Sequence, residues 1–384
     1  MALDNETFAL MKDAVARFVQ ERLVPAEDIV EETNDVPEEI IGEMRELGLF
    51  GLSIPEEYGG LGLSMLQECE IIHELCKASL AFRSVIGTTV GIGSQGLVMT
   101  GTDEQKEQYL PRLASGEIIS SFCLTEPEAG SDAASLRTTA VRDGGDYVLN
   151  GTKRFITNAL RAGMLTVMAR TNPDKKGASG ISAFLVDPKT PGITIAKADD
   201  KMGQRGTKTS DVIFEDARIP ASALLGGEEG QGFYTAMKVL DRGRLHLSSV
   251  STGISERILA EALNYAAERK QFGTAIGEFQ LVQALLADSQ AELFAGKAMT
   301  LDAAQKYDNK EDISMLAACC KMFTTEAAGK IADRAVQIHG GSGYMSEYKV
   351  ERFYRDVRLL RLYEGTTQIQ QLVIARNMLK TLTN

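Results

Sequence analysis

The segment Tyr363-Glu364-Gly365-Thr366-Thr367-Gln368 places a carboxylate just before the last predicted helix of the chain. Because Gly365 has no side chain, a ligand can approach the neighbouring Glu364 closely. A glutamate in such a position suits the role of a general base. The alternative interpretation is an acidic residue that stabilises the positive end of the helix dipole.

Three further segments contain residue types that suit ligand binding. In residues 122–132, FCLTEPEAGSD, a strand-like run turns into a loop whose N–H groups and Ser131 hydroxyl could hold a pyrophosphate. Phe155-Ile-Thr157-Asn158 offers an aromatic ring and a hydroxyl, and Gln337-Ile-His-Gly340-Gly341 ends a helix with two glycines. The alternatives are, in turn, a capped turn, a strand end and a helix stop.

Several common motifs are absent or incomplete. Gly91-Ile-Gly93-Ser-Gln-Gly96 matches the dinucleotide fingerprint in letters, but its flanks are helical and Thr100-Gly101 breaks the helix within about one turn. These glycines are interpreted as close helix packing or a wall beside a ligand. The three histidines lack ligand spacing, so no metal site is predicted, and neither a P-loop nor G-x-S-x-G occurs.

The elements that must position these segments fall into three regions, which predict an α+β multi-domain protein. Residues 1–117 have helical periodicity and are expected to form an N-terminal helical domain. Short β-rich runs over 118–228 predict a β-barrel or sandwich, with Asn150-Gly151 as a hairpin turn. Long amphipathic runs over 229–384 predict a C-terminal four-helix bundle.

Composition excludes several classes of partner. The 384 residues include 41 Lys and Arg against 53 Asp and Glu, a formal charge of −12. This sign disfavours nucleic-acid binding and anchoring on anionic lipid. The smoothest apolar run, residues 85–99, is interrupted by glycines and too short for a membrane helix. The acidic N-terminus and the absence of C-x-x-C pairs lead us to expect a cytoplasmic protein.

Five segments together resemble the acyl-CoA dehydrogenase family over nearly the whole chain. In chain order they are the T-E-P-x-x-G-S-D loop, F-I-T-N, Arg269-Lys-Gln-Phe272-Gly273, Q-I-H-G-G and Y-E-G-T-T-Q-I-Q. The order of helical, β and helical regions agrees with this resemblance. It implies non-covalent FAD, an acyl-CoA substrate, a homotetramer, and an electron-transferring flavoprotein as partner.

The resemblance also implies contacts for each position that matches a family motif. The isoalloxazine ring of FAD is expected to contact Phe122, Leu124, Thr125, Phe155 and Thr157. Trp is common in the family at the position of Phe155, whereas this chain has no Trp. Ser131 is expected at the pyrophosphate or the pantetheine arm of the substrate.

A second set of contacts involves the adenosine side of FAD and the substrate. Thr366 and Gln368 are expected to hold the adenosine side. The FAD of a neighbouring subunit is expected to contact Arg269, Gln280, Gln337, Gly340 and Gly341. The substrate is expected to contact Arg83, Ser131, Asp241, Arg244, Tyr363 and Gly365.

The implied chemistry is α,β-dehydrogenation of an acyl-CoA to the trans-2-enoyl-CoA. Glu364 removes the α-proton, and burial raises its pKa so that it is better matched as a base. The family stabilises the enolate with the FAD ribityl hydroxyl and the backbone N–H of Glu364. The β-hydride passes to the flavin.

The dipeptide Arg83-Ser84 allows two alternatives for the acyl group of the substrate. Glutaryl-CoA dehydrogenases have Arg-Ser at this position to hold a distal carboxylate, so a decarboxylating glutaryl-CoA-type enzyme is one alternative. The favoured expectation is that Arg83 faces solvent or pairs with a helix carboxylate, and that the acyl chain is uncharged. A flavin oxidase or monooxygenase, or a non-catalytic binding or assembly protein, is disfavoured by the intact base and flavin motifs.

Overall fold

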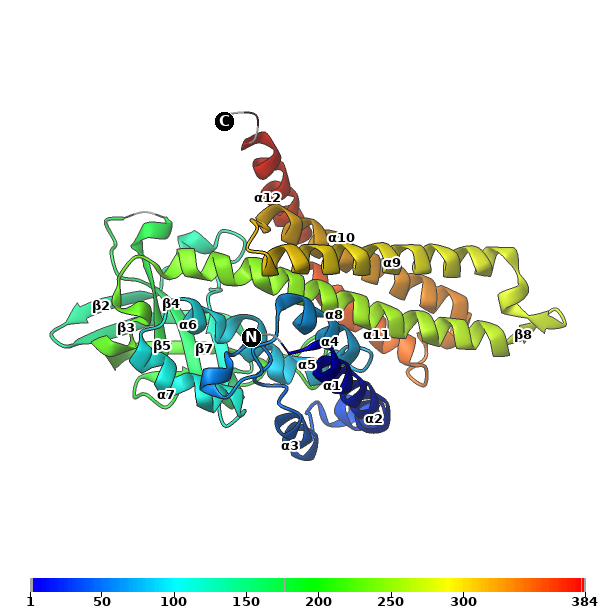
Figure 1. Ribbon diagram of the computed structural model, residues 1–384, viewed down its shortest axis with the longest axis horizontal. Helices are drawn as coiled ribbons and strands as arrows, with labels where there is room; N and C mark the ends of the chain where they lie inside the picture. The colour runs from blue at the N-terminus through cyan, green and yellow to red at the C-terminus, as the bar shows by residue number, and fades with distance from the viewer. Residues whose placement is uncertain (1–2, 176, 381, 383–384) are drawn as a thin grey trace.

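The computed structural model describes residues 3–175, 177–380 and 382. Its elements follow the expected order of helices, one sheet and long helices, so the predicted α+β architecture is confirmed (Figure 1). The first group of helices is α1 (Asn5–Phe18), η1 (Val19–Leu23), α2 (Val24–Thr33), α3 (Glu38–Glu46), α4 (Met65–Leu75), α5 (Leu80–Gly87), η3 (Thr88–Gly93), α6 (Gln95–Thr100) and α7 (Asp103–Ala114).

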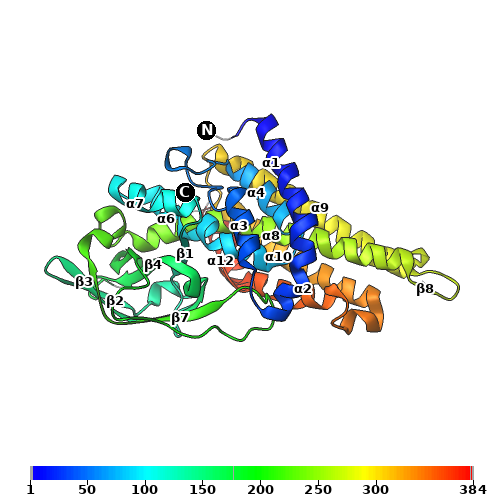
Figure 2. The same cartoon turned by 90° about the horizontal axis from the view of Figure 1, so that it is seen from below.

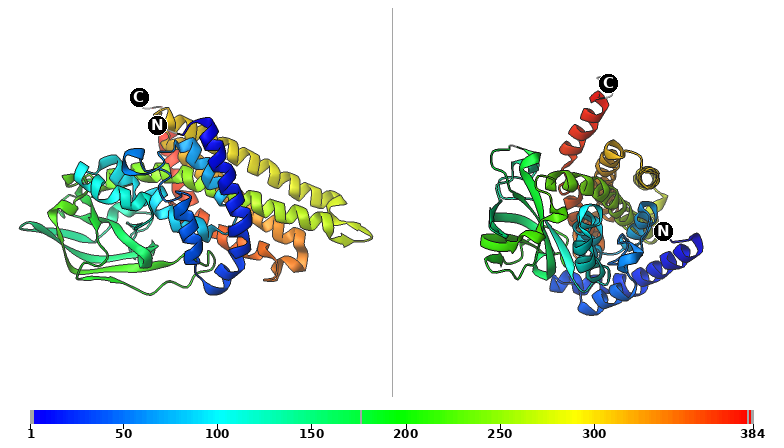
Figure 3. Two further views of the ribbon diagram at one scale, coloured as in Figure 1. Left: turned by 60° about the horizontal axis from the view of Figure 1, so that its bottom comes forward. Right: turned by 60° about the vertical axis from the view of Figure 1, so that its left-hand side comes forward.

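The middle region is one curled sheet with strand order β1-β4-β2-β3-β7-β6, and β5 pairs with β4 beside this path. It lies against one side of the helices (Figure 3). The strands are β1 (Ile119–Cys123), β2 (Thr139–Asp143), β3 (Asp146–Thr157), β4 (Ala162–Arg170), β5 (Ile181–Val186), β6 (Ile193–Ile195) and β7 (Thr209–Pro220).

The expected hairpin turn at Asn150-Gly151 is wrong. β3 runs straight through these residues, and the turn between β2 and β3 lies at Gly144-Gly145. The pairing of β3 with β7 shifts register at this point, as in a β-bulge. The Asn150 side chain donates to the Asp216 carboxylate at 3.0 Å and accepts from the Asp216 N–H at 2.9 Å. Asn150-Gly151 therefore forms a bulge in β3. The Asn150 side-chain amide is satisfied by Asp216 of the paired strand β7, so it does not stabilise a turn.

The C-terminal region is a helical bundle that extends away from the sheet (Figure 2). α10 packs against α8 and α9, and α11 and α12 pack against α10. The elements are α8 (Gly232–Glu268), β8 (Lys270–Gln271), β9 (Thr274–Ala275), α9 (Gln280–Asp308), α10 (Ser314–His339), η10 (Gly340–Tyr344), α11 (Lys349–Val357), η11 (Arg358–Arg361) and α12 (Thr367–Lys380).

The centre of the molecule is where the three regions meet. Residues 242–255 of α8 are all buried, so this stretch lacks the polar stripe of a surface helix. The α5–η3 segment joins the sheet through polar contacts: Asn158 donates to the Ser84 carbonyl at 2.8 Å and the Ser120 N–H donates to Thr89 at 3.1 Å. Within the described residues, no helix is both long and apolar enough to cross a membrane.

Candidate active site

Glu364 lies in a tight turn immediately before α12. Glu364 has φ +55° and Gly365 has φ +89°. Gln370 of α12 holds the turn, since its side-chain amide donates to the carbonyls of Glu364 at 3.1 Å and of Gly365 at 3.0 Å. A Cβ at Gly365 would lie 2.5 Å from the Gln370 amide nitrogen, so the turn requires glycine. A glutamate at positive φ costs conformational energy, and such strain concentrates at functional sites.

The Glu364 carboxylate is shielded from solvent against α8. A Cβ at Gly243 would lie 2.8 Å from Oε2 of Glu364 and 3.2 Å from Cγ2 of Ile92. Oε2 is buried and has no hydrogen-bond partner among the described residues. Burial raises the pKa of Glu364, although the charges of Arg83, Lys321 and Arg244 act in the opposite direction. The carboxylate therefore has the unpaired oxygen and the raised pKa that proton abstraction requires.

Lys321 of α10 lies directly behind this turn. The residue has no exposed surface, and its Nζ donates to the Gly365 carbonyl at 2.7 Å. Burial lowers the pKa of Lys321 to about 8, while the charge of Glu364 raises it. Lys321 was not among the predicted site residues, because a lysine within a helical run gives no local signal of its distance from Glu364.

The predicted flavin-ring residues lie at the C-terminal ends of β1 and β3. Phe122 lies on β1, and Leu124 and Thr125 follow it. Phe155 and Thr157 end β3, and the Thr157 carbonyl accepts from the Ser121 hydroxyl at 2.8 Å, which ties the two strands together. The Phe155 side chain is 57% exposed at φ +59°, with the Arg154 guanidinium 4.7 Å from its ring centre. An exposed ring in a strained backbone is suited to contact a ligand.

A buried ion pair holds the loop that carries Thr125 and Ser131. Lys153 has no exposed surface, and its Nζ donates to the Glu126 carboxylate at 2.8 Å and to the Leu124 carbonyl at 3.1 Å. The same carboxylate accepts from the N–H groups of Arg137 at 2.6 Å and Thr138 at 2.9 Å. The loop is thus fixed at its base, while Ser131 remains exposed.

The predicted substrate residues on α8 form an ion pair within one helical turn of Gly243. Arg244 donates to the Asp241 carboxylate at 2.5 Å. Burial raises the pKa of Asp241, although Arg244 acts against this shift. Nε of Arg244 is buried without a partner among the described residues. The charge of Arg244 acts to lower the pKa of Glu364, so the pair is electrostatically linked to the predicted base.

The remaining predicted FAD residues do not join this site. The structure places them on exposed surfaces of the bundle. The β8–β9 hairpin is at one end of the molecule and the sheet is at the other (Figures 1 and 2). The separated residues are Arg269, Gln280, Gln337, Gly340 and Gly341. Thr366 and Gln368, by contrast, follow Glu364 directly and lie at the start of α12.

The expectation that Arg83 faces solvent or pairs with a helix carboxylate is wrong. Arg83 is 7% exposed on α5, and its Nε donates to Nε2 of His246 at 3.0 Å. Burial raises the pKa of both Tyr363 and Glu364, and the charge of Arg83 acts in the opposite direction, so Arg83 influences the candidate site. The partner His246 and, behind it, Glu68 were not predicted, because they come from helices far apart in the sequence.

The glycines of the incomplete dinucleotide motif allow η3 to pack closely against α8 and against β1. Gly91 packs against the His246 ring, with a Cβ position 3.8 Å from it. A Cβ at Gly93 would lie 2.0 Å from the Ser120 hydroxyl. The interpretation of these glycines as positions of close packing is confirmed.

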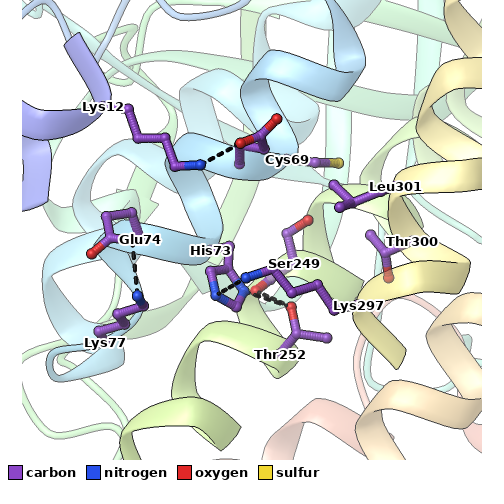
Figure 4. A pocket seen from close by; sticks show the side chains of 11 residues that line it. Lys12, Cys69, His73, Glu74, Lys77, Ser249, Thr252, Lys297, Thr300 and Leu301 are labelled. Carbon is purple, nitrogen blue, oxygen red and sulfur yellow. Dashed lines mark hydrogen bonds and ion pairs between the residues drawn. The ribbon is translucent and has the colours of Figure 1, made fainter. Parts of the chain in front are cut away.

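A separate cavity of about 240 Å³ opens between α1, α4, α8 and α9 (Figure 4). His73 lies at its centre and contacts Thr252 at 3.0 Å and Glu256 at 2.8 Å. Lysines 12, 77 and 297 line it, each beside a glutamate. Its described lining residues include none of the predicted site residues. Among the described residues, no group of His, Cys, Asp and Glu could hold a metal ion.

Comparison with known proteins identifies the family. Residues 5–117, 121–217 and 230–379 match the models of the acyl-CoA dehydrogenase N-terminal, middle and C-terminal domains. The chain belongs to the acyl-CoA dehydrogenase family. The 3-(aryl)acrylate reductase of Clostridium sporogenes is 41% identical, covering 98% of this chain and 99% of that protein. An acyl-CoA dehydrogenase of Bacillus subtilis is 40% identical, covering 96% and 97%.

Other members of the family differ in what their names say they act on. The CarC subunit of a caffeyl-CoA reductase-Etf complex from Acetobacterium woodii is 42% identical, covering 92% of this chain and 93% of that protein. Butyryl-CoA dehydrogenase from Megasphaera elsdenii has a TM-score of 0.93 and 34% identity, with 99% of each chain covered. A glutaryl-CoA dehydrogenase bound to glutaryl-CoA has a TM-score of 0.94 and 33% identity, covering 99% and 96%.

Membership of this family makes the protein an oxidoreductase that uses FAD. The residues present fit such a group. The exposed Phe155 ring offers a surface for a planar cofactor. At Gly340 and Gly341 an added Cβ would meet nothing within 4 Å, which leaves room for a ligand at the end of α10.

Proposed function

We propose that the protein catalyses α,β-dehydrogenation of an acyl-CoA thioester to the trans-2-enoyl-CoA, with Glu364 as the base. The observation that supports this most directly is the buried Oε2 of Glu364, which has no partner among the described residues and packs against Gly243. An unpaired carboxylate oxygen is costly to bury, unless a ligand supplies the missing partner. The α-hydrogen of an acyl chain lying beside Gly243 would be that partner.

The chain's own residues perform the proton transfer and the binding. Glu364 takes the α-proton on its carboxylate, and its backbone N–H, which makes no hydrogen bond to the described residues, donates to the thioester carbonyl. We propose that Arg244 and Asp241, which pair with each other on α8, bind the CoA portion of the substrate. The same groups serve enoyl-CoA reduction in reverse, since Glu364 then returns the proton.

Bound FAD would supply the acceptor for the β-hydride. We propose that Phe122, Leu124, Thr125, Phe155 and Thr157 hold its ring. Ser131, Thr366 and Gln368 bind its phosphates and adenosine. The exposed residues of the bundle, Arg269, Gln280, Gln337, Gly340 and Gly341, reach the FAD of another copy of the chain. We also propose an electron-transferring flavoprotein as the redox partner, which is in line with the named complex of the CarC relative.

The variant Glu364→Gln tests the base. The amide keeps the size of the side chain but cannot accept a proton, and a general base supplies about 10²–10⁴ in rate. The variant is therefore expected to bind FAD and acyl-CoA while flavin bleaching slows by at least about 100-fold. Stopped-flow absorbance over a panel of acyl-CoAs measures this. A variant that bleaches at nearly the wild-type rate would place the base elsewhere.

A second candidate, an acyl-CoA with a distal carboxylate, is favoured by the burial of Arg83. In Arg83→Met, turnover of glutaryl-CoA is expected to fall by at least about 30-fold, because the carboxylate then lacks a buried partner. Turnover of pentanoyl-CoA, which has the same carbon count without the charge, is expected to hold or improve. Equal small changes in turnover for both substrates would instead support a substrate with an uncharged acyl chain. Release of labelled carbon dioxide would identify the decarboxylating form of the reaction.

A further inference from the structure

Arg83 belongs to a buried chain of four polar side chains that crosses from α5 to α4 and α8. Arg83 donates from Nε to Nε2 of His246 at 3.0 Å, and Nδ1 of His246 lies 2.7 Å from Oε1 of Glu68. The other oxygen of Glu68 accepts from Arg242. The exposed fraction of these four residues is 7% or less. A polar chain this deep is costly, and each member must have its partner.

The hydrogen bonds determine the protonation of His246. An arginine Nε can only donate, so Nε2 of His246 must accept, and the ring proton must then be on Nδ1. From Nδ1 it is donated to Glu68. Burial and the nearby Arg83 charge lower the pKa of His246 to about 4, so the ring stays neutral at physiological pH. His246 thus accepts from Arg83 only while Glu68 accepts from His246.

The chain leaves an excess of positive charge at its Arg83 end. Glu68 has a full charge but already contacts Arg242, which also donates to the Val90 carbonyl at 3.2 Å. The neutral His246 imidazole therefore lies between Arg83 and Glu68, the carboxylate of this group of four polar side chains. Within the described residues, neither terminal nitrogen of Arg83 has a hydrogen-bond partner. Two donors on a buried guanidinium remain available to a ligand.

The available donors lie near the reacting centre. Gly243, which contacts the Glu364 carboxylate, and His246 are three residues apart on α8, so they share one face about one turn apart. Gly87 of α5 lies beside the guanidinium, where a Cβ would be 3.0 Å from its central carbon. The Arg83 charge acts on the Glu364 carboxylate, as do the charges of Lys321 and Arg244. Arg244 is itself paired with Asp241.

We propose that His246, held by Glu68, is a positioning residue for acyl specificity. It fixes Nε of Arg83 so that both terminal nitrogens face the acyl pocket and bind an anionic group at the distal end of the acyl chain. This inference rests on the proposed function and deepens its second candidate. It assigns no part of the proton transfer to His246.

The test compares His246→Leu with the matched control His73→Leu. Both histidines are buried, both bridge α4 and α8, and both contact a glutamate, but His73 lies in the separate cavity of Figure 4. Affinities for glutaryl-CoA and pentanoyl-CoA are measured by titration calorimetry in the FAD-loaded Glu364→Gln background, which does not turn over. Loss of the hydrogen bond to a charged partner is expected to weaken glutaryl-CoA binding by about 10- to 100-fold. Pentanoyl-CoA binding should stay within about threefold.

Two further variants complete the test. His246→Gln, whose amide can both accept from Arg83 and donate to Glu68, should restore glutaryl-CoA affinity to within about threefold of the parent. His246→Met, of similar volume, replaces the leucine variant if that one fails to fold, with the same expected outcome. Equal weakening for both ligands, no rescue by glutamine, or the same selective loss in His73→Leu would each overturn the proposal. Failure of the proposed function is seen separately, as wild-type flavin that no acyl-CoA bleaches.

Discussion

At the scale of single residues, the site depends on the carboxylate of Glu364, whose pKa is shifted in opposite directions by burial and by nearby positive charges. Burial raises the pKa of Glu364, and three cations nearby restrain that shift. Lys321 is the cation that also contacts the turn itself, through the Gly365 carbonyl at 2.7 Å. The strained turn and the protonation of its base are therefore coupled through one lysine side chain.

Replacing Lys321 by Met should move the acid limb of activity to higher pH. A base works only when ionised, so activity is lost as pH falls through its raised pKa. Removal of a nearby positive charge raises that pKa further. The measurement is the pH dependence of kcat/KM for acyl-CoA oxidation. Lys330→Met serves as the control, because Lys330 is on the same helix but pairs with Glu292 at the surface. An acid limb that stays in place or moves to lower pH would contradict this role.

At the scale of elements, the buried ion pair of Lys153 and Glu126 fixes the loop of residues 124–138 to the sheet. Glu126 accepts from Lys153 and from two backbone N–H groups across the base of residues 124–138. Burial acts against ionisation, yet Lys153 and these hydrogen bonds keep the pKa of Glu126 below its ordinary value. The stability from this pair is therefore present above the ordinary glutamate pKa and lost as pH falls through the lowered one.

Glu126→Ala should lower the free energy of unfolding by about 3–5 kcal/mol, because it leaves the buried Lys153 charge without its partner. Denaturant unfolding measures the change, and FAD affinity should fall with it as the loop loosens. Asp143→Ala is the control: its contact with Arg218 is exposed and is worth at most about 1 kcal/mol. The double variant Lys153→Met/Glu126→Ala should recover part of the loss. If the double variant recovers no stability, the loss in Glu126→Ala comes from the hydrogen bonds of Glu126 to the backbone N–H groups and not from the unpaired lysine.

At the scale of the whole molecule, the structure separates the predicted FAD residues into two groups. One group lies at the C-terminal ends of β1 and β3 and at the start of α12, and the other lies on the exposed end of the bundle (Figure 1). The C-terminal part of α12 projects from the bundle (Figure 3), and the helix exposes Leu372, Met378 and Leu379. Leu281 and Phe294 of α9 are likewise exposed. Large apolar side chains left exposed on two helices of the bundle are available for contact with another copy of the chain.

Dilution into monomers should therefore release FAD. If Arg269 donates to the cofactor of another copy, Arg269→Ala should weaken FAD retention while Lys270→Ala, an exposed neighbour in the same hairpin, should not. Sedimentation followed by flavin absorbance reports both the assembly state and the bound cofactor. A monomer that sediments with its FAD would remove the contribution from a second copy.

The sequence by itself determined the features that depend on neighbouring residues. The glycine after Glu364, the helix that begins at Thr367 and the succession of helical and β regions all follow from local spacing, and the structure confirms these elements. The family motifs identified the candidate site for the same reason: each is a short segment whose chemistry is contained in adjacent residues.

Tertiary structure alone decided the features that depend on a distant partner. Asn150-Gly151 has the preference of a turn, but pairing with Asp216 on β7 makes it a bulge. Arginine is usually exposed, and only the tertiary structure buries Arg83, whose Nε donates to His246 of α8, 163 residues away in the sequence. Local preferences amount to about 1 kcal/mol per residue, whereas an unpaired buried charge costs several. The long-range partner therefore prevails wherever the two conflict.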